Sequence, residues 1–291
     1  MGSLIIIIDY SAIAIATVFS QPNDLDENRL RHQILNSIRM YNSKYRKEYG
    51  QTVIACDQTS WRKEKFPQYK AKRKSARAES PIDWGKLFGI LNGIRDEISA
   101  EMPYPVITVD RAEADDVIAA LVESTQEFGM HEPVLIVSAD KDFLQLHRYS
   151  NVKQFSPMKK KLITTDDPLY YKFEHICKGD VSDGVPNILS PDNTFTDGIR
   201  QSPMRSKKIK EWFNQPMDKL IDSMGTEAFR NYCRNKSVID LDCIPADIVK
   251  NIMEVYKSQQ GKTNSKVLNY LITKRCSMLV ESANDFFTNE K

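Results

Sequence analysis

Leu4-Ile5-Ile6-Ile7-Ile8-Asp9 is the stretch of sequence that decides the fold, because five apolar residues run without interruption into an aspartate. A continuous apolar run of this length predicts a strand buried on both faces, as in a parallel sheet. Similar runs cover residues 52–56, 106–109 and 134–138, and a weaker one covers 152–155. We therefore expect a central, mostly parallel sheet built from these segments.

Helical patterns lie between these strands and dominate the end of the chain. Apolar residues recur at helical spacing in residues 26–49, 83–102 and 112–128. Strands alternating with helices predict an α/β fold with helices flanking the sheet. After about residue 165 strand signals almost vanish, and helical patterns follow at 167–178, 204–214, 216–235, 245–258 and 264–274. We expect an α/β domain at 4–165 and a helical C-terminal region at 166–291.

The composition narrows the class of protein. The five cysteines are scattered and lack the spacing of a zinc or redox motif, which predicts reduced thiols in a cytosolic protein. No segment approaches the roughly 20 apolar residues of a membrane span, so we expect a cytoplasmic protein with no membrane partner. The net charge of +2 excludes nothing, because nucleic-acid binding depends on where the charges lie.

Acidic residues gather where the expected strands end. Asp9, Asp57 and Asp140 each fall at or just after a strand, and the carboxyl ends of parallel strands share one edge of a sheet. Six further acids are expected near that edge: Glu113, Asp115, Asp116, Asp142, Asp180 and Asp183. Their repulsion would be severe without cations, and hard divalent ions such as Mg²⁺ prefer oxygen ligands. Two such ions about 3.5–4 Å apart are the arrangement that cleaves phosphodiesters.

An alternative assigns each acid to its own helix. Acidic residues often cap helices or occupy their first turn, where they favour the helix dipole. We assign Asp110 to this class, as an N-cap of the helix expected at 112–128, and Asp116 stays ambiguous. This alternative explains single residues better than it explains the whole set.

Residues 58–82 form a basic segment directly after Asp57. It contains eight basic residues and only two acidic ones, and three aromatic residues lie among them: Trp61, Phe66 and Tyr69. Cations can follow the phosphates of a single strand while rings stack on its bases. A solvated charged loop is the alternative interpretation.

Several ordered motifs carry a resemblance to a known family. They are Ile7-Ile8-Asp9, Cys56-Asp57, Trp61-Arg62, Tyr69 to Arg73, Glu113 to Asp116, Ser138 to Phe143, Asn151 to Met158, Lys178 to Asp183 and Asp240 to Pro245. In this order, over about residues 4–275, the chain resembles the flap-endonuclease-like 5′ nucleases, and among them the ribonuclease H group of T-even-type bacteriophages. Each motif alone is weak evidence for this resemblance, whereas the ordered set is strong evidence.

The resemblance implies a set of site residues. Two Mg²⁺ ions, which Mn²⁺ can replace, would be bound by Asp9, Asp57, Glu113, Asp115, Asp140, Asp142, Asp180 and Asp183. Residues 58–82 would form a helical arch, in which Lys70 and Arg73 contact the scissile phosphate as catalytic residues. Further contacts to nucleic acid are expected from Arg62, Lys63, Lys72 and Lys74.

One stretch departs from the wider family. A glycine-rich turn that grips the duplex is expected after Asp183, but residues 187–203 are longer and contain Gly198 as their one glycine. Phage members also differ here, which supports the phage assignment and leaves the duplex grip open. The basic residues that follow could serve instead, or could be a solvated helix face: Arg205, Lys207, Lys208 and Lys210.

The expected function is that of an enzyme, a Mg²⁺-dependent 5′ to 3′ exonuclease and flap endonuclease that removes RNA primers and adjacent DNA from lagging-strand fragments. Its substrates would be forked, flapped or nicked DNA and RNA–DNA hybrids, cleaved by a monomer in the infected host cytoplasm. A phage single-stranded-DNA-binding protein and a sliding clamp are candidate partners. The alternatives are a PIN-type ribonuclease on single-stranded RNA, which would typically be shorter and lack the basic arch, and a non-catalytic, structure-specific DNA-binding module, which would lack some of the acids.

Overall fold

A computed structural model describes residues 4–20 and 25–288 of the chain. It divides into two compact units. The sheet unit comprises Met1–Thr59, Ile82–Thr164 and Ala246–Lys291, and the helical unit comprises Ser60–Pro81 and Thr165–Pro245.

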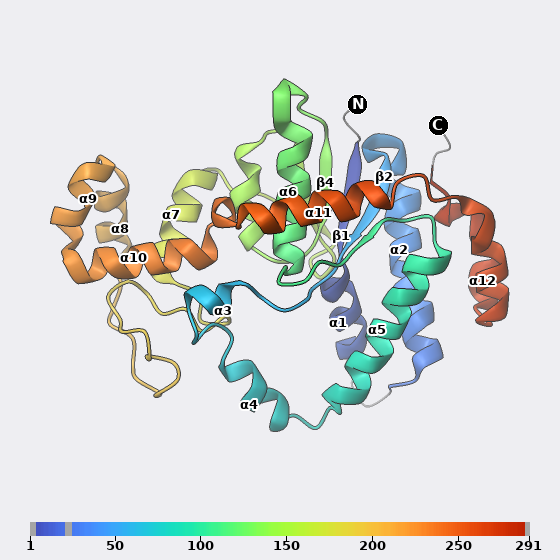
Figure 1. The fold of residues 1–291 in the computed structure, drawn as a ribbon, viewed down its shortest axis with the longest axis horizontal. Coiled ribbons are helices and arrows are strands. Elements are labelled where there is room, and N and C mark those ends of the chain that lie inside the picture. The colour runs from blue at the N-terminus through green and yellow to red at the C-terminus, as the bar shows by residue number, and fades with distance from the viewer. Residues whose placement is uncertain (1–3, 21–24, 289–291) are drawn as a thin grey trace. The chain divides into compact units, whose positions relative to one another are not determined.

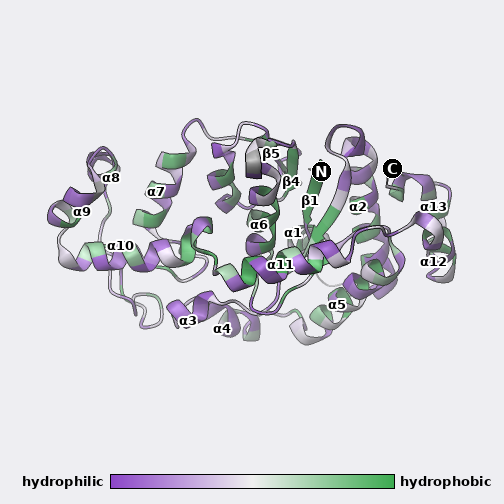
Figure 2. Cartoon of the chain, turned by 45° about the horizontal axis from the view of Figure 1, so that its top comes forward, coloured by the Kyte–Doolittle hydropathy of each residue, from purple (hydrophilic) through white to green (hydrophobic). Residues whose placement is uncertain are grey.

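The sheet unit is built on a six-stranded sheet with β1 inside it. The strands are β1 (Ile5–Asp9), β2 (Gln51–Ala55), β3 (Val106–Ile107), β4 (Val134–Val137), β5 (Val152–Ser156) and β6 (Lys161–Ile163). Their order is β3-β2-β1-β4-β5-β6, and all neighbours are parallel except β5 and β6. Figure 2 shows β1 and β4 coloured as hydrophobic along their length. The predicted mostly parallel α/β fold is confirmed, with the short exposed strand β6 added at one edge.

Helices cover the sheet. They are α1 (Tyr10–Ser20), α2 (Glu27–Tyr49), α5 (Trp84–Glu101), α6 (Ala114–Gln126), α11 (Ala246–Ser258), α12 (Val267–Thr273) and α13 (Ser277–Val280), with short 3-10 helices η1 (Glu127–Gly129), η2 (Asp142–Arg148), η4 (Asn264–Lys266) and η5 (Ala283–Phe286). Asp26 caps α2 by accepting a hydrogen bond from the Arg29 N–H. The helix ends at Gly50, whose φ of 73° and close approach to Leu4 exclude a side chain.

The last part of the chain belongs to the sheet unit. In Figure 1, α11 runs across α6, which it contacts together with β3. Leu271 of α12 and Phe286 of η5 belong to the same core as Ile6 and Ile8 of β1. The buried Tyr104 hydroxyl donates a hydrogen bond to the Phe286 carbonyl at 2.6 Å. The predicted domain boundary at residue 165 stays a prediction. In the structure, residues 246–291 belong to the same compact unit as the sheet.

The helical unit has its own core. Its elements are α3 (Arg62–Lys65), α4 (Lys72–Ala78), α7 (Pro168–Lys178), α8 (Ser206–Phe213), α9 (Met217–Met224), α10 (Thr226–Ile239) and η3 (Leu241–Cys243). Phe66 and Tyr69 of the basic segment are buried among Ile176, Trp212 and Tyr232 from three of these helices. The segment is therefore partly helical and is fixed to this unit by its aromatic side chains. Among the described helices, none is long and apolar enough to span a membrane.

Candidate active site

Three of the predicted acids lie at or just after strands, at the carboxyl edge of the sheet. Asp9 is the last residue of β1 and pairs in register with Ala55 of β2, so that Asp57 follows two residues beyond. Ile8 pairs with Val137 of β4, which brings Ser138 level with Asp9 and leads the chain directly to Asp140. Three neighbouring strands thus deliver their acids to one edge, because the strands are parallel and in register.

Asp9 is the buried centre of this group. Asp9 is 7% exposed, and its carboxylate accepts hydrogen bonds from the Ala12 N–H and the Ser138 hydroxyl, both at 2.9 Å. Burial raises the pKa of Asp9 from 3.8 to about 7, and the negative charges of Asp57 and Asp140 act in the same direction. The two hydrogen bonds oppose this rise without cancelling it. A buried carboxylate facing two others favours a positive charge beside it.

The first turn of α6 brings further acids to the end of β2. The Ala114 N–H donates to the Asp57 carboxylate at 2.9 Å, which ties the helix start to Asp57. Glu113 is the buried N-cap, and the Asp116 carboxylate accepts a hydrogen bond from the Glu113 N–H at 2.9 Å. This contact gives Asp116 the capping role that the sequence left open. The expectation that Asp110 caps this helix is wrong, because α6 begins at Ala114.

Asp140 and Asp142 lie on the turn that follows β4. The Asp140 carboxylate accepts a hydrogen bond from the Asp142 N–H at 2.9 Å, where η2 begins. We call the six predicted metal ligands of the sheet unit the edge acids: Asp9, Asp57, Glu113, Asp115, Asp140 and Asp142.

The helical unit holds the two remaining predicted ligands, the loop acids Asp180 and Asp183. Helix α7 ends at Gly179, with a φ of 67°, and a Cβ there would lie 2.3 Å from the Val185 carbonyl oxygen. This close approach allows Asp180 and Val185 to exchange two backbone hydrogen bonds of 2.8 and 2.7 Å, which close the loop. Glycine is required at this position because of both the backbone conformation and the contact.

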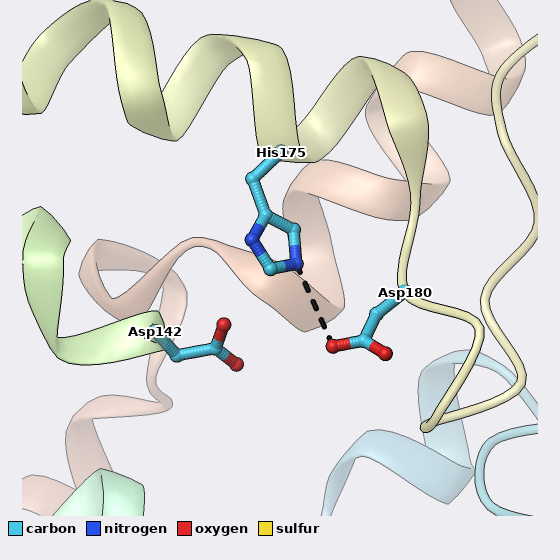
Figure 3. Close-up of side chains that lie close together, drawn as sticks. All are labelled: Asp142, His175 and Asp180. Carbon is cyan, nitrogen blue, oxygen red and sulfur yellow. Dashed lines mark ion pairs between the residues drawn. The ribbon is translucent and has the colours of Figure 1, made fainter. Parts of the chain in front are cut away.

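Asp180 is surrounded by groups that stabilise its charge. Figure 3 shows its ion pair with the His175 ring, 3.6 Å away, and the Ser182 hydroxyl donates to the same carboxylate at 2.7 Å. Burial raises the pKa of Asp180, but the contacts with His175 and Ser182 outweigh it and hold the pKa well below its ordinary value. Asp180 is therefore an anion that the protein itself compensates.

Asp183 contacts three residues from the middle of the basic segment. The Tyr69 hydroxyl donates to its carboxylate at 2.8 Å, Arg73 donates at 2.5 Å, and the Lys70 ammonium lies 3.4 Å away. The Lys70 N–H also donates to the Asp183 carbonyl at 2.7 Å. Lys70 has a φ of 56°, a conformation that is strained for a lysine and is held by these contacts.

The two predicted catalytic cations, Lys70 and Arg73, lie together because both contact Asp183, which the sequence did not predict. The resemblance implied that both lie in a helical arch, but α4 begins only at Lys72, so Lys70 lies outside the helix. Lys70 and Arg73 meet instead on the Asp183 carboxylate. Sequence reasoning also missed the hydroxyl of Tyr69, because the pairing spans more than a hundred residues and leaves no local pattern.

The aromatic residues of the basic segment are not placed as the sequence suggested. Trp61, Phe66 and Tyr69 are each at most 3% exposed, so the expectation that they stack on bases is wrong for this structure. Arg62 is also buried: it lies over the Trp61 ring and donates to the Val238 carbonyl at 2.8 Å. In this structure Arg62 therefore has a structural role, in place of the exposed position that the predicted contact with nucleic acid requires. The other predicted contacts are all exposed and stay predictions: Lys63, Lys72, Lys74, Arg205, Lys207 and Lys208.

Two protein-family models match the chain, and together they cover most of its length. The family described as 5′-3′ exonuclease, N-terminal resolvase-like domain, matches residues 4–174. The family described as T4 RNase H, C terminal, matches residues 169–286. The ribonuclease H of Enterobacteria phage T4 is 35% identical over 295 residues, which cover 97% of this chain and 95% of that protein.

Two solved structures of bacteriophage T5 proteins share the fold. The T5 flap endonuclease, in a pseudo-enzyme–product complex with DNA and metal ions, has a TM-score of 0.63 at 18% identity and covers 87% of this chain and 99% of that chain. The T5 5′-exonuclease with bound zinc has a TM-score of 0.61 at 16% identity and covers 88% of this chain and 99% of that chain. At these identities the likeness is one of fold.

Proposed function

The chain belongs to the 5′-3′ exonuclease family, as a 5′ nuclease with a C-terminal domain of the T4 RNase H type, and we propose that it removes RNA primers and adjacent DNA from lagging-strand fragments by metal-dependent hydrolysis. The observation that carries this proposal is the position of the buried Asp9 carboxylate, which faces Asp57 and Asp140 at the carboxyl edge of three neighbouring strands. A group of acids arranged in this way is suited to binding divalent cations.

The edge acids fit Mg²⁺ better than softer metals. Every ligand they offer is a carboxylate oxygen, which hard cations prefer, and Mn²⁺ can use the same ligands. We propose that the edge acids hold two ions, and Asp180 and Asp183 of the helical unit remain predicted ligands. When bound, they supply a hydroxide nucleophile and neutralise the leaving oxygen.

The helical unit supplies the residues for the substrate phosphate. Lys70 and Arg73 lie together on Asp183, which holds both cations ready to stabilise charge on the phosphoryl oxygens. Tyr69 fixes the same carboxylate by its hydroxyl. Asp183 therefore positions these cations in addition to its proposed contact with metal.

The proposed substrates are forked, flapped or nicked DNA and RNA–DNA hybrids, bound by a monomer. The exposed lysines of residues 58–82 would contact the single strand, and Arg205, Lys207 and Lys208 would contact the duplex backbone. A single-stranded-DNA-binding protein and a sliding clamp are proposed partners, and the cytoplasm of an infected host cell is the proposed location.

The test is digestion of 5′-labelled flap, nicked and RNA–DNA hybrid substrates with and without Mg²⁺. We expect cleavage near the 5′ end in Mg²⁺ and none in chelator. Binding of these substrates without cleavage in any divalent metal would contradict the proposal and favour a DNA-binding module. Cleavage confined to single-stranded RNA would favour a ribonuclease of the PIN type.

A further inference from the structure

Two fully buried polar residues lie behind the edge acids. Ser138 follows β4 directly, Gln154 is the middle residue of β5, and both are 0% exposed. The partners of Gln154 in register on the two adjacent strands are both apolar: Ile136 of β4 and Ile163 of β6. A buried amide is costly to desolvate unless its hydrogen bonds are made. An amide at this position therefore calls for an explanation in terms of what it contacts.

The Gln154 side chain holds the backbone that leads to Asp140. Its Nε2 donates to the Ser138 carbonyl at 3.0 Å and to the Asp140 carbonyl at 2.5 Å. The chain leaves the sheet here, after a last ladder hydrogen bond from the Ser138 N–H to the Phe155 carbonyl at 3.1 Å. Gln154 thus supplies donors to carbonyls that lie beyond the end of the strand, and it fixes the turn on which Asp140 stands.

The Ser138 hydroxyl connects this turn to Asp9. It donates to the Asp9 carboxylate at 2.9 Å and accepts a hydrogen bond from the Asp140 N–H at 3.1 Å. One hydroxyl therefore sets the distance between two acids that repel each other. Gln154 acts on Asp9 through Ser138, since it holds the main chain of the same residue.

We propose that Gln154 and Ser138 are positioning residues that hold Asp9 and Asp140 in the geometry required to bind divalent cations. This inference rests on the proposed function. Both residues are fully buried, so they act through the orientation of the acids. Partners that orient metal ligands in this way typically change metal affinity or activity by about 10–100-fold when they are removed.

The test compares Gln154→Leu and Ser138→Ala with the wild-type protein. Mg²⁺ binding is measured by calorimetry without DNA, and single-turnover cleavage is measured as a function of Mg²⁺ concentration. We expect both variants to need about tenfold more Mg²⁺ for half-saturation in both experiments. Cleavage should recover at high Mg²⁺, and binding of forked DNA in chelator should not change, because the nucleic-acid contacts are intact.

A matched control separates positioning from general stability. Gln126 is also a buried glutamine, and its Nε2 donates to the Thr125 hydroxyl at 2.7 Å and to the Glu132 carbonyl at 3.2 Å. Glu132 precedes β4, so these contacts lie at the opposite edge of the sheet from the edge acids. Gln126→Leu should lower the melting temperature and leave the Mg²⁺ requirement unchanged.

The outcomes distinguish this inference from the proposed function. Wild-type Mg²⁺ affinity in both variants, with a lowered melting temperature alone, would overturn the positioning role and leave the nuclease intact. A wild-type protein that binds no Mg²⁺ and cleaves nothing would overturn the proposed function, and the inference with it. Ser138→Ala, which removes a single oxygen atom, decides the question if Gln154→Leu does not fold.

Discussion

The edge acids and the loop acids are the same kind of residue in opposite surroundings. Asp9 faces the carboxylates of Asp57 and Asp140, and its pKa is raised to about 7 by burial and by their charge. Asp180 faces His175, which holds its pKa below the ordinary value despite burial, and Asp183 faces Lys70 and Arg73. The sheet unit thus sets carboxylates against one another around Asp9, whereas the helical unit provides hydrogen-bond donors or cations for both of its acids.

This difference assigns separate tasks to the two sets. The edge acids repel one another, so a divalent cation that binds there relieves a cost already present in the folded protein. The loop acids gain less from an added cation, because ion pairs already compensate them. Their contacts instead fix the cations that we propose for the substrate phosphate.

The largest expected effect is on chemistry. Asp142→Asn should lower single-turnover cleavage by at least about a thousandfold, or more than about 4 kcal/mol of barrier. It should leave binding of forked DNA nearly intact, because the proposed ions act mainly on the transition state. Glu254→Gln is the control, since Glu254 is an acid on α11 whose ion pair joins it to the exposed Lys250. Near wild-type turnover of Asp142→Asn in Mg²⁺ would contradict a metal role for this edge acid.

The second effect is on stability without metal. The pKa of Asp9 is about 7 in the folded protein against an ordinary value of 3.8, which the unfolded chain should show, so the folded protein binds more protons between these values. Stability in chelator should therefore fall as the pH rises from about 4 to about 7, by up to roughly 3 kcal/mol between pH 5 and pH 8. Urea unfolding in chelator measures this change.

Asp9→Asn removes the charge and should remove most of this pH dependence. The variant should be more stable than the wild-type protein in chelator at pH 8 and should gain less from added Mg²⁺. Equal unfolding curves for the two proteins at both pH values would show that the edge acids do not form one repulsive group. Asp183→Asn should instead destabilise the protein, because it breaks the favourable ion pairs with Lys70 and Arg73.

The sequence predicts more about the edge acids than about the contacts of the loop acids. Apolar runs predicted the parallel strands, and strand ends predicted Asp9, Asp57 and Asp140, because a parallel sheet places those ends together. The Asp183 contacts could not be read in this way, since they join residues more than a hundred positions apart. The prediction that the aromatic residues of the basic segment stack on bases failed for a related reason. An aromatic side chain between charged residues can stack on a nucleic-acid base or pack into a protein core, and the sequence does not distinguish the two. The pattern of α11 likewise predicted a helix but not its packing partner.

The third effect concerns the basic segment. Lys70→Ala should reduce single-turnover cleavage at saturating enzyme by at least about tenfold, or about 1.4 kcal/mol of barrier. The exposed Lys63 is the matched comparison, and Lys63→Ala should mainly weaken binding and reduce its salt dependence. Wild-type cleavage by Lys70→Ala under these conditions would remove the catalytic role of this lysine, and the edge acids would then have to explain catalysis alone.

The smallest effect isolates the hydrogen bond from Tyr69 to Asp183. Tyr69→Phe keeps the buried ring and removes only the hydroxyl, so it should cost about 1 kcal/mol of unfolding free energy. A double-mutant cycle with Asp183→Asn measures the coupling between the two side chains. Additive effects of the two changes would show that this contact does not organise the loop.

The most direct measurement is the number of protons released when Mg²⁺ binds, obtained by calorimetry in buffers of different ionisation enthalpy. With a pKa of about 7, Asp9 is mostly protonated at pH 6 and must lose its proton to bind a cation. We expect close to one proton released per protein at pH 6, far fewer at pH 8, and none from this site in Asp9→Asn. Mg²⁺ binding with no proton release at pH 6, or identical release by the variant, would contradict a metal site built on mutually repelling edge acids.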